Sequence, residues 1–163
     1  MSEDAPAFRD APAFRNARRE DVPAIVALLA DDALGAGRET PAGREGDLDE
    51  AYWNAFAQVR DDPRNRVIVA EAGGQVVGTL QLTLIPGLSR HGMLRAQIEA
   101  VRVAASQRGA GVGHAMIEWA IGQARAAGCG LVQLTSDKQR PGAIRFYESL
   151  GFTATHEGLK LPL

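Results

Sequence analysis

The stretch Arg108-Gly-Ala-Gly-Val-Gly113 constrains the fold of this chain more than any other. It lies between the apolar residues 98–103, which have the composition of a strand, and a run with helical spacing from about Gly111. Three glycines at every second position leave the backbone uncovered by side chains, and the helix start offers unpaired N–H groups. Because free amides and the helix dipole favour negative charge, we expect a phosphate-bearing ligand here, with Arg108 adding positive charge.

The glycines alone leave two other interpretations open. A strand, a glycine-rich turn and a helix also occur in dinucleotide-binding folds and in plain tight packing. A dinucleotide-binding enzyme would need a first strand-helix-strand unit near the N-terminus, which this sequence does not predict. Its motif would also read Gly109-x-Gly111 followed by Gly113, one residue too early for the third glycine.

Length and composition predict an ordinary globular domain. The chain has 163 residues, of which 45% are hydrophobic and 23% charged, enough for one sizeable core. A net charge of -2 argues against nucleic acid as the main partner. No apolar run approaches the roughly 18 residues of a membrane span, and the sequence shows no signal-peptide core. The single Cys129 cannot form an internal disulfide, so we expect a cytoplasmic location.

A short direct repeat occupies residues 4–9 and 10–15. Two such short copies cannot build a solenoid, whose units need about 20–50 residues. We expect the first copy to belong to a disordered tail, residues 1–10. The second copy is expected to contribute the first strand of a single domain, residues 11–163.

Periodicity and turn signals predict the remaining helices and strands. We expect one helix from about Val22, with Asp21 as its N-cap, and another from a capping box of Asp47 and Glu50. Further helices are expected at residues 111–127 and 141–150. Strands are expected at residues 67–71, 76–85, 94–104 and 131–135, and as a final pair within residues 152–161. Gly73-Gly74 is a hairpin signal between the first two of these strands.

The apolar pattern of residues 94–104 changes parity. Residues 94, 96 and 98 are apolar at even positions, whereas Val101 and Val103 are apolar at odd ones. A parity change in a period of two predicts a β-bulge around residues 98–101, with Glu99 on it. Bulges often lie beside active sites, where they free backbone groups from the ladder. Chance in a short pattern is the alternative explanation.

Two motifs in this order resemble the GNAT superfamily of acetyl-CoA-dependent N-acetyltransferases. The first is Arg108-x-x-Gly111-x-Gly113, and the second is Phe146-Tyr147-x-x-x-Gly151-Phe152 after the next strand. The resemblance is clearest over residues 67–152. It implies an α/β (α+β) fold with a twisted, mixed, mostly antiparallel sheet of six to seven strands, flanked by about four helices. It also implies that strands 4 and 5 splay apart, that acetyl-CoA enters this cleft as co-substrate, and that a primary amine approaches from the opposite side.

The resemblance also assigns roles to residues. The pantetheine arm would pair with the main chain of Val101, Arg102 and Val103, and the bulge amide would face the thioester carbonyl. The CoA pyrophosphate would be held by the backbone amides of Arg108, Gly109, Ala110, Gly111, Val112, Gly113 and His114. Where many members have Asn this chain has Arg140, which offers no amide oxygen. Arg140 and Lys138 face CoA phosphates or are solvated surface charges.

Amine acetylation requires three further groups. An amine attacks a thioester only when neutral, so a base must take its proton, directly or through water. Glu99 is the candidate base; His91, in the loop before the same strand, and a water relay are the alternatives. The tetrahedral intermediate needs a donor at its oxygen, which a backbone N–H outside the ladder supplies. Tyr147 can protonate the leaving thiolate, and its alternative role is a core aromatic beside Phe146.

The acceptor is the least determined part of the prediction. We expect an N-acetyltransferase that needs no metal and acts on a small-molecule or peptide amine in a ternary complex. Since members of the family are often homodimers, we also expect a homodimer. A non-catalytic acyl-CoA-binding or sensory module would keep the glycine turn but need neither Tyr147 nor a base. Acidic residues in and beside the loop at 32–46 favour a small cationic amine: Asp31, Asp32, Glu39, Glu45 and Asp47.

Overall fold

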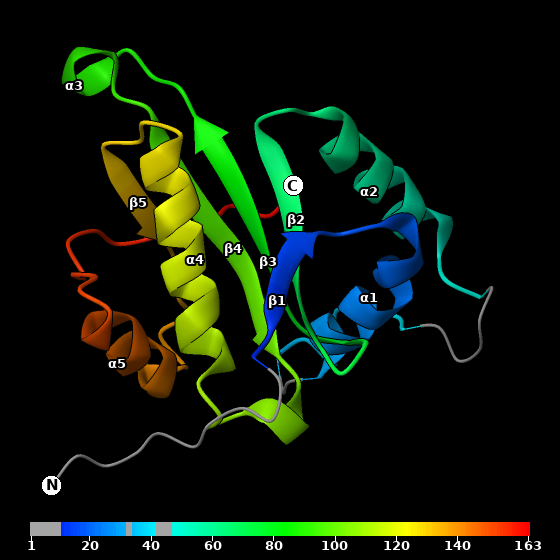
Figure 1. Ribbon diagram of the computed structural model, residues 1–163. Helices are drawn as coiled ribbons and strands as arrows, with labels where there is room; N and C mark the ends of the chain where they lie inside the picture. Colours follow the sequence, from blue (N-terminus) through cyan, green and yellow to red (C-terminus); the bar gives the residue numbers. More distant parts are fainter. Residues whose placement is uncertain (1–10, 32–33, 42–46) are drawn as a thin grey trace, which may run out of the picture.

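The computed structural model describes residues 11–31, 34–41 and 47–163. Residues 1–10, which we predicted to be a disordered tail, lie outside this part, as do Asp32 and Glu45 of the predicted acidic loop. Figure 1 shows a central sheet with helices on both of its faces.

Five strands form the sheet of the described residues, in the order β1-β2-β3-β4-β5. They are β1 Ala13–Asn16, β2 Asn65–Ala72, β3 Gln75–Ile85, β4 Arg95–Val103 and β5 Leu131–Leu134. Neighbours are antiparallel except β4 and β5, which are parallel and therefore need a crossover connection. Gly73 and Gly74 join β2 to β3 with φ angles of 57° and 74°, which suit the tight hairpin turn that their pairing predicted.

Four helices of two or more turns flank the sheet, and they are α1 Val22–Ala30, α2 Glu50–Asp61, α4 Val112–Ala126 and α5 Pro141–Ser149. A single turn, α3 Ser89–Gly92, lies at the tip of the β3–β4 hairpin and projects beyond the sheet in Figure 1. Helix α4 lies on one face of the sheet, and α1 and α2 lie on the other. Of these described helices, none combines the length and the apolarity needed to cross a bilayer.

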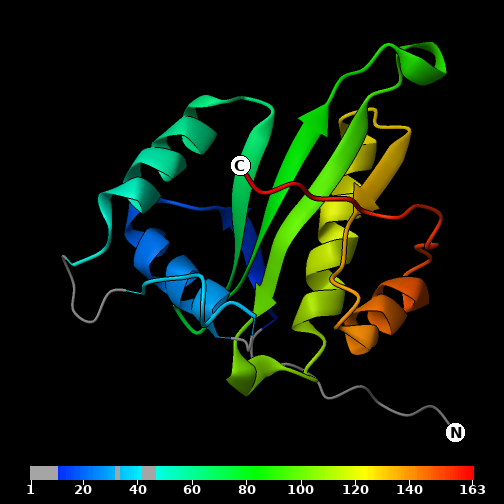
Figure 2. The same ribbon diagram turned by 180° about the vertical axis from the view of Figure 1, so that it is seen from behind.

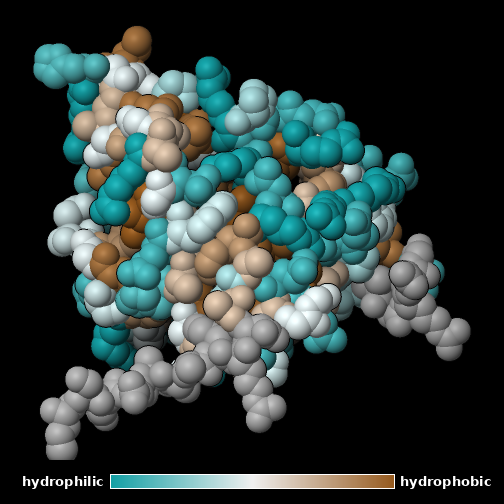
Figure 3. Space-filling view, viewed as in Figure 1, coloured by the Kyte–Doolittle hydropathy of each residue, from teal (hydrophilic) through white to brown (hydrophobic). Residues whose placement is uncertain are grey.

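Helix α4 is positioned by the main core. Its residues Met116, Ile117, Ala120 and Ala124 are fully buried and follow helical spacing. They pack on side chains from one face of β2, β3 and β4, namely Ile68, Ala70, Leu80, Leu82, Ala96 and Ile98. A Cβ at Gly78 would lie 2.7 Å from the Met116 sulfur, so only glycine lets α4 approach β3 this closely. On the face seen in Figure 3, hydrophobic residues gather over α4 and its neighbours.

Helix α2 begins later than the capping box predicted. Asp49, not Asp47, is the N-cap, and its carboxylate accepts a hydrogen bond of 2.9 Å from the N–H of Ala51. Leu48, just before the cap, is buried in a cluster that includes Trp53, four residues into the helix. Burial of Leu48 in this cluster anchors the chain just before the helix and favours a cap at Asp49.

The predicted final strand pair was wrong, and with it the predicted total of six to seven strands. Residues 152–163 form no strand, and all from Thr153 onward are exposed. Figure 2 shows this segment crossing in front of the sheet, on the face opposite α4. Lys138 holds it through an exposed 2.6 Å ion pair with Glu157. Leu159, Leu161 and Leu163 are exposed, so a hairpin here would bury little apolar surface.

Candidate active site

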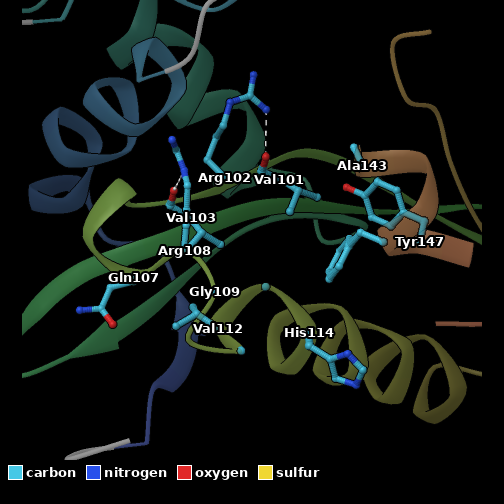
Figure 4. Close-up of a pocket in the computed structure, with 13 residues that line it drawn as sticks. Val101, Arg102, Val103, Gln107, Arg108, Gly109, Val112, His114, Ala143 and Tyr147 are labelled. Atoms are coloured by element: carbon cyan, nitrogen blue, oxygen red, sulfur yellow. Dashed lines mark hydrogen bonds between the residues drawn. The ribbon is translucent and has the colours of Figure 1, made fainter. Parts of the chain in front are cut away.

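A pocket of about 500 Å³ lies where β4 ends, the glycine turn follows, and α4 and α5 approach each other. Figure 4 shows side chains from all of these segments around it. Its lining consists of Val101, Arg102, Val103, Gln107, Arg108, Gly109, Gly111, Val112, Gly113, His114, Ala143, Phe146 and Tyr147. The structure therefore brings together most of the residues that the two sequence motifs singled out.

The predicted bulge in β4 is confirmed. Glu99 pairs with Gln81 and Arg102 pairs with Thr79, so two residues of β4 face the single Leu80 of β3. The extra residue is accommodated by Ala100, whose φ of 53° is rare for a residue with a side chain. The bulge is why buried side chains change from even to odd positions along this strand.

Strands β4 and β5 separate beside the bulge. Their pairing ends at Ile98 and Leu134, whereas β4 continues to Val103. From that point the backbone of β4 has no neighbour in the sheet on its β5 side. An open strand edge can pair with an extended ligand through main-chain hydrogen bonds. Because β5 itself ends at Leu134, this open edge is consistent with the predicted splay between strands 4 and 5, which stays a prediction.

The glycine turn presents free backbone amides to the pocket. Gly109 and Gly111 have φ angles of 81° and 83°, a left-handed conformation that glycine adopts at little cost. Helix α4 starts directly after Gly111. No acceptor among the described residues bonds the N–H groups of Gly109, Gly111, Val112, Gly113 and His114. Amides at a helix start attract anions, and these five amides are the strongest chemical feature of the pocket.

Two amides of the predicted set are already bonded within the protein. The N–H of Arg108 donates to Ala105 and that of Ala110 donates to Gln107. The Arg108 guanidinium donates to the Val103 carbonyl at 3.2 Å and to the backbone and side chain of Asp31 at 2.8 and 3.2 Å. Arg108 therefore ties the turn to the end of α1, besides lining the pocket.

Tyr147 projects from α5 into the pocket, toward the strand that carries Val101 (Figure 4). Its ring makes edge contacts with Phe146 and Phe152, at centroid distances of 5.1 and 5.9 Å. Burial raises the pKa of the Tyr147 phenol above its ordinary value, although the positive charges of Arg102 and Arg140 oppose this rise. The phenol therefore stays protonated at neutral pH and can serve as a proton donor.

The two candidate bases lie in different places. Glu99 is exposed beside the bulge and has no hydrogen-bond or ion-pair partner among the described residues. His91 lies in α3, at the end of β4 opposite the glycine turn (Figure 1). The strand from Arg95 to Ala100 alone spans about 16 Å, so His91 lies far from the bulge. This distance favours Glu99 over His91 as the base.

The remaining predicted residues lie partly inside and partly outside the pocket lining. Arg140 precedes α5 and its charge acts on Tyr147, but it does not line the pocket. The His114 imidazole lies 3.2 Å from Glu118 one turn along α4. Of the predicted acidic loop, Asp31 binds Arg108 and Glu39 accepts a 2.8 Å hydrogen bond from the Tyr52 hydroxyl. These two acids are therefore engaged in contacts within the protein.

The sequence analysis gave no role in the site to Gln107, Ala143 and Phe146, which also line the pocket. Ala143 lies one helical turn before Tyr147 and so shares its face of α5, a signal that helical spacing could have supplied. Gly113 lies 3.6 Å from Phe146 and from Val103, measured from an added Cβ. A methyl group fits there, whereas a larger side chain would enter the pocket.

Cys129 is not among the residues that line the pocket. Cys129 packs against the main core, and burial raises the pKa of its thiol. Within residues 11–31, 34–41 and 47–163, no group of three or more His, Cys, Asp and Glu side chains is arranged to hold a metal.

Residues 22–152 match the Acetyltransferase (GNAT) family. The chain belongs to this family. Membership confirms the family and the acyltransferase class that the glycine turn and the Phe-Tyr motif predicted. The family match begins at the first residue of α1 and ends just after α5, so it includes every segment that lines the pocket.

Two curated GNAT relatives and one solved structure illustrate the similarity. A glucosamine 6-phosphate N-acetyltransferase of Trypanosoma brucei brucei is 36% identical over 98 residues, which cover 60% of this chain and 65% of that protein, slightly less than two thirds. An aminoalkylphosphonate N-acetyltransferase of Salmonella typhimurium is 29% identical over 142 residues, covering 86% and 84%. A Bacillus halodurans protein described as a transcriptional regulator is 45% identical, with a TM-score of 0.89 over 93% of this chain and 99% of that chain.

Proposed function

We propose that this GNAT protein transfers the acetyl group of acetyl-CoA to a primary amine by direct attack in a ternary complex. The observation that carries the proposal is the row of five backbone N–H groups without a protein acceptor, from Gly109 to His114. They open into a pocket beside the unpaired edge of β4. This combination suits a ligand with a pyrophosphate at one end and an extended arm at the other.

The pocket residues divide the binding between them. The free amides of the glycine turn and α4 hold the pyrophosphate, and the backbone of Val101 and Val103 pairs with the pantetheine arm. Arg102, whose guanidinium bonds the Val101 carbonyl at 2.9 Å, keeps the bulge in shape (Figure 4). Arg140 adds positive charge near the thioester end. Acetyl-CoA supplies an activated acyl group when it is bound.

Three groups move the protons and charge of the reaction. Glu99 takes a proton from the amine, directly or through water, so that the nitrogen lone pair can attack the carbonyl carbon. A backbone N–H at the bulge stabilises the negative oxygen. The carbon–sulfur bond then breaks, and the Tyr147 hydroxyl gives its proton to the departing sulfur. The acylated nitrogen releases its second proton, which restores the Tyr147 hydroxyl, directly or through water. The raised pKa of Tyr147 supports this role, because the phenol carries its proton until it is needed.

We propose a small-molecule amine as the acceptor. The two enzymes similar to this chain act, by their names, on glucosamine 6-phosphate and on aminoalkylphosphonates. A peptide amine is the alternative, and an acceptor screen that follows CoA release distinguishes them. Transfer to lysine peptides but to no small amine would reject a small-molecule acceptor.

A second candidate is a non-catalytic acyl-CoA-binding or sensory module. It is favoured by the similarity to the protein described as a transcriptional regulator. The retained Tyr147, directed into the pocket, argues for catalysis. Calorimetry with acetyl-CoA followed by single-turnover measurements decides between the two. Tight binding without transfer to any amine would favour the sensory module, and absence of binding would reject both.

We also propose that residues 11–163 form one acetyltransferase domain in the cytoplasm and that two copies form a homodimer. The single free thiol at Cys129 supports a reducing compartment. The homodimer is supported by the exposed leucines at 159, 161 and 163, which share one side of an extended segment.

A further inference from the structure

The sheet face opposite α4 carries a row of polar side chains. Ala96 and Ile98 of β4 are buried under α4, so the alternate residues Arg95, Gln97 and Glu99 lie on the other face. Gln81 and Gln133 are the direct neighbours of Glu99 and Gln97 on β3 and β5. The row therefore starts at the bulge, beside the proposed reaction centre, and runs away from it along β4.

The amides of this row are paired but retain hydrogen-bonding capacity. Gln133 donates to Gln97 at 2.6 Å, and Gln81 donates to Asn65 of β2 at 2.9 Å. Each side-chain amide has two donors and an oxygen with two lone pairs, so each pair keeps groups for a ligand. The contacts hold the amides in fixed orientations, which suits recognition of a polar molecule.

Two opposite charges mark the ends of the row. The Nε of Arg95 is buried without a hydrogen-bond acceptor, and its guanidinium makes no ion pair with any described residue. Glu99 likewise has no partner within the described part of the chain. Arg95 and Glu99 are four positions apart along β4, so their Cα atoms are about 13 Å apart. At this distance, side chains that extend straight out from the sheet do not form a direct ion pair. A half-buried arginine without a protein partner is costly unless something else compensates its charge.

We propose that Arg95 binds an anionic group of the acceptor, so that the preferred substrates are small zwitterionic amines. The ammonium form of the amine is drawn to Glu99, and a phosphate, phosphonate or carboxylate several bonds away lies over Arg95. Hydroxyl or amide groups between them bond the paired glutamines. The proposal rests on the proposed function, because it uses the same acceptor face.

This charge arrangement refines the small cationic acceptor expected from the sequence, which stays a prediction. That expectation used acidic loop residues, of which Asp31 and Glu39 are bound to Arg108 and Tyr52. On β4, the two charges of this face, Glu99 and Arg95, are of opposite sign and have no ion-pair partner among the described residues. A zwitterion complements both, whereas a simple cation complements only one.

The test compares acceptors that differ only in the anion. The probes are glucosamine 6-phosphate with glucosamine, and 3-aminopropylphosphonate with 3-aminopropanol, assayed by thiol release from acetyl-CoA. Wild type is expected to prefer the anionic member of a pair by about 10- to 100-fold in kcat/KM, the range of a hydrogen bond to a charged group. Arg95→Gln should remove that preference by raising KM, and Arg95→Lys should keep part of it.

Controls separate charge recognition from loss of structure. Arg90→Gln removes an exposed arginine of α3 from the same hairpin and should leave both acceptors unaffected. Glucose 6-phosphate, which has the anion but no amine, should inhibit wild type competitively and Arg95→Gln at least tenfold less. Equal losses with anionic and neutral acceptors in both Arg95 variants, or a wild-type preference for neutral amines, would overturn the proposal. Those outcomes leave acetyl transfer intact, whereas failure of the proposed function would abolish transfer to every amine.

Discussion

Tyr147 and Glu99 show how position along the backbone assigns different chemistry to two side chains. Tyr147 is half-buried between two aromatic rings, which keeps its phenol protonated, whereas Glu99 is exposed at the bulge. This difference in burial supports the proposed roles of Tyr147 as proton donor and Glu99 as base.

Replacing Tyr147 by phenylalanine tests the proton donor. Tyr147→Phe removes one hydroxyl and little packing, so the free energy of unfolding should change by less than roughly 1.5 kcal/mol. The single-turnover rate of acetyl transfer should fall by about 10²-fold, with little change in KM for acetyl-CoA. Wild-type single-turnover rates would reduce Tyr147 to a packing residue.

The same residue predicts a dependence of stability on pH. Because folding raises the pKa of Tyr147, the neutral phenol contributes stability that is fully present below about pH 10 and is lost as the pH rises through the folded pKa. Above pH 10 the melting temperature of wild type should therefore fall more steeply than that of Tyr147→Phe. Parallel curves for the two proteins would contradict the raised pKa.

Replacing Glu99 by glutamine tests the base. Glu99→Gln should lower kcat by about 10²-fold and should remove the acidic limb of the kcat profile, because an amide cannot accept the amine proton. Glu148→Gln, at an exposed position of α5, is the matched control and should behave as wild type. If the profile of Glu99→Gln superimposes on that of wild type, a water relay replaces Glu99.

At the scale of elements, the start of α4 combines a conformational requirement with a chemical one. Gly111 must adopt a left-handed conformation so that the helix can begin directly after it. The same conformation turns the following amides toward the pocket. Gly111 therefore allows the shape of the turn, and the turn exposes the backbone amides that we propose attract the anionic pyrophosphate.

Substitution of Gly111 should separate binding from folding. Gly111→Ala places a side chain at a φ of 83°, at a cost of about 1–2 kcal/mol, and should raise the Kd of acetyl-CoA at least tenfold as the turn relaxes. Gly122→Ala, in the same helix with nothing near the added Cβ, should stabilise the protein by about 0.5–1 kcal/mol at unchanged Kd. Calorimetry and urea unfolding measure both quantities, and unchanged binding by Gly111→Ala would place the ligand elsewhere.

At the scale of the whole molecule, a buried charge network fastens β1 to the remainder of the fold. Arg15 bonds Asp21 before α1 at 2.6 Å and Glu71 of β2 at 2.6 Å. The hydrogen bond from Arg15 holds the pKa of the buried Asp21 below its ordinary value, against the effect of burial. The network joins segments that are 56 residues apart in the chain.

Removing the Asp21 charge should destabilise the protein in a pH-dependent manner. Asp21→Asn should lower the free energy of unfolding at pH 7 by about 1.5–3 kcal/mol, since it weakens charged hydrogen bonds. Because folding lowers the pKa of Asp21, its contribution is fully present above about pH 5 and is lost as the pH falls through the folded pKa. The difference between the two proteins in urea unfolding should therefore shrink toward pH 3, and a constant difference would contradict this explanation.

Three local features of the fold could be predicted from the sequence. The bulge, the Gly73-Gly74 turn and the glycine turn before α4 were predictable because each depends on consecutive residues. Parity along a strand and the need for positive φ are properties of the local backbone, and the sequence records them directly. The free amides follow from the same local signals, since every helix start has them.

Tertiary packing decided the rest. Helix α2 starts at Glu50, next to the buried Leu48. Residues 152–163 form no strand, and their leucines are exposed. The pairing of Asp31 with Arg108 and that of Gln97 with Gln133 join residues whose relation depends on how the strands and helices assemble. The sequence by itself thus determined the family, the bulge and the glycine turn before α4. Only the folded chain decided which charges are already compensated, because a side chain's partners are set by distance in space.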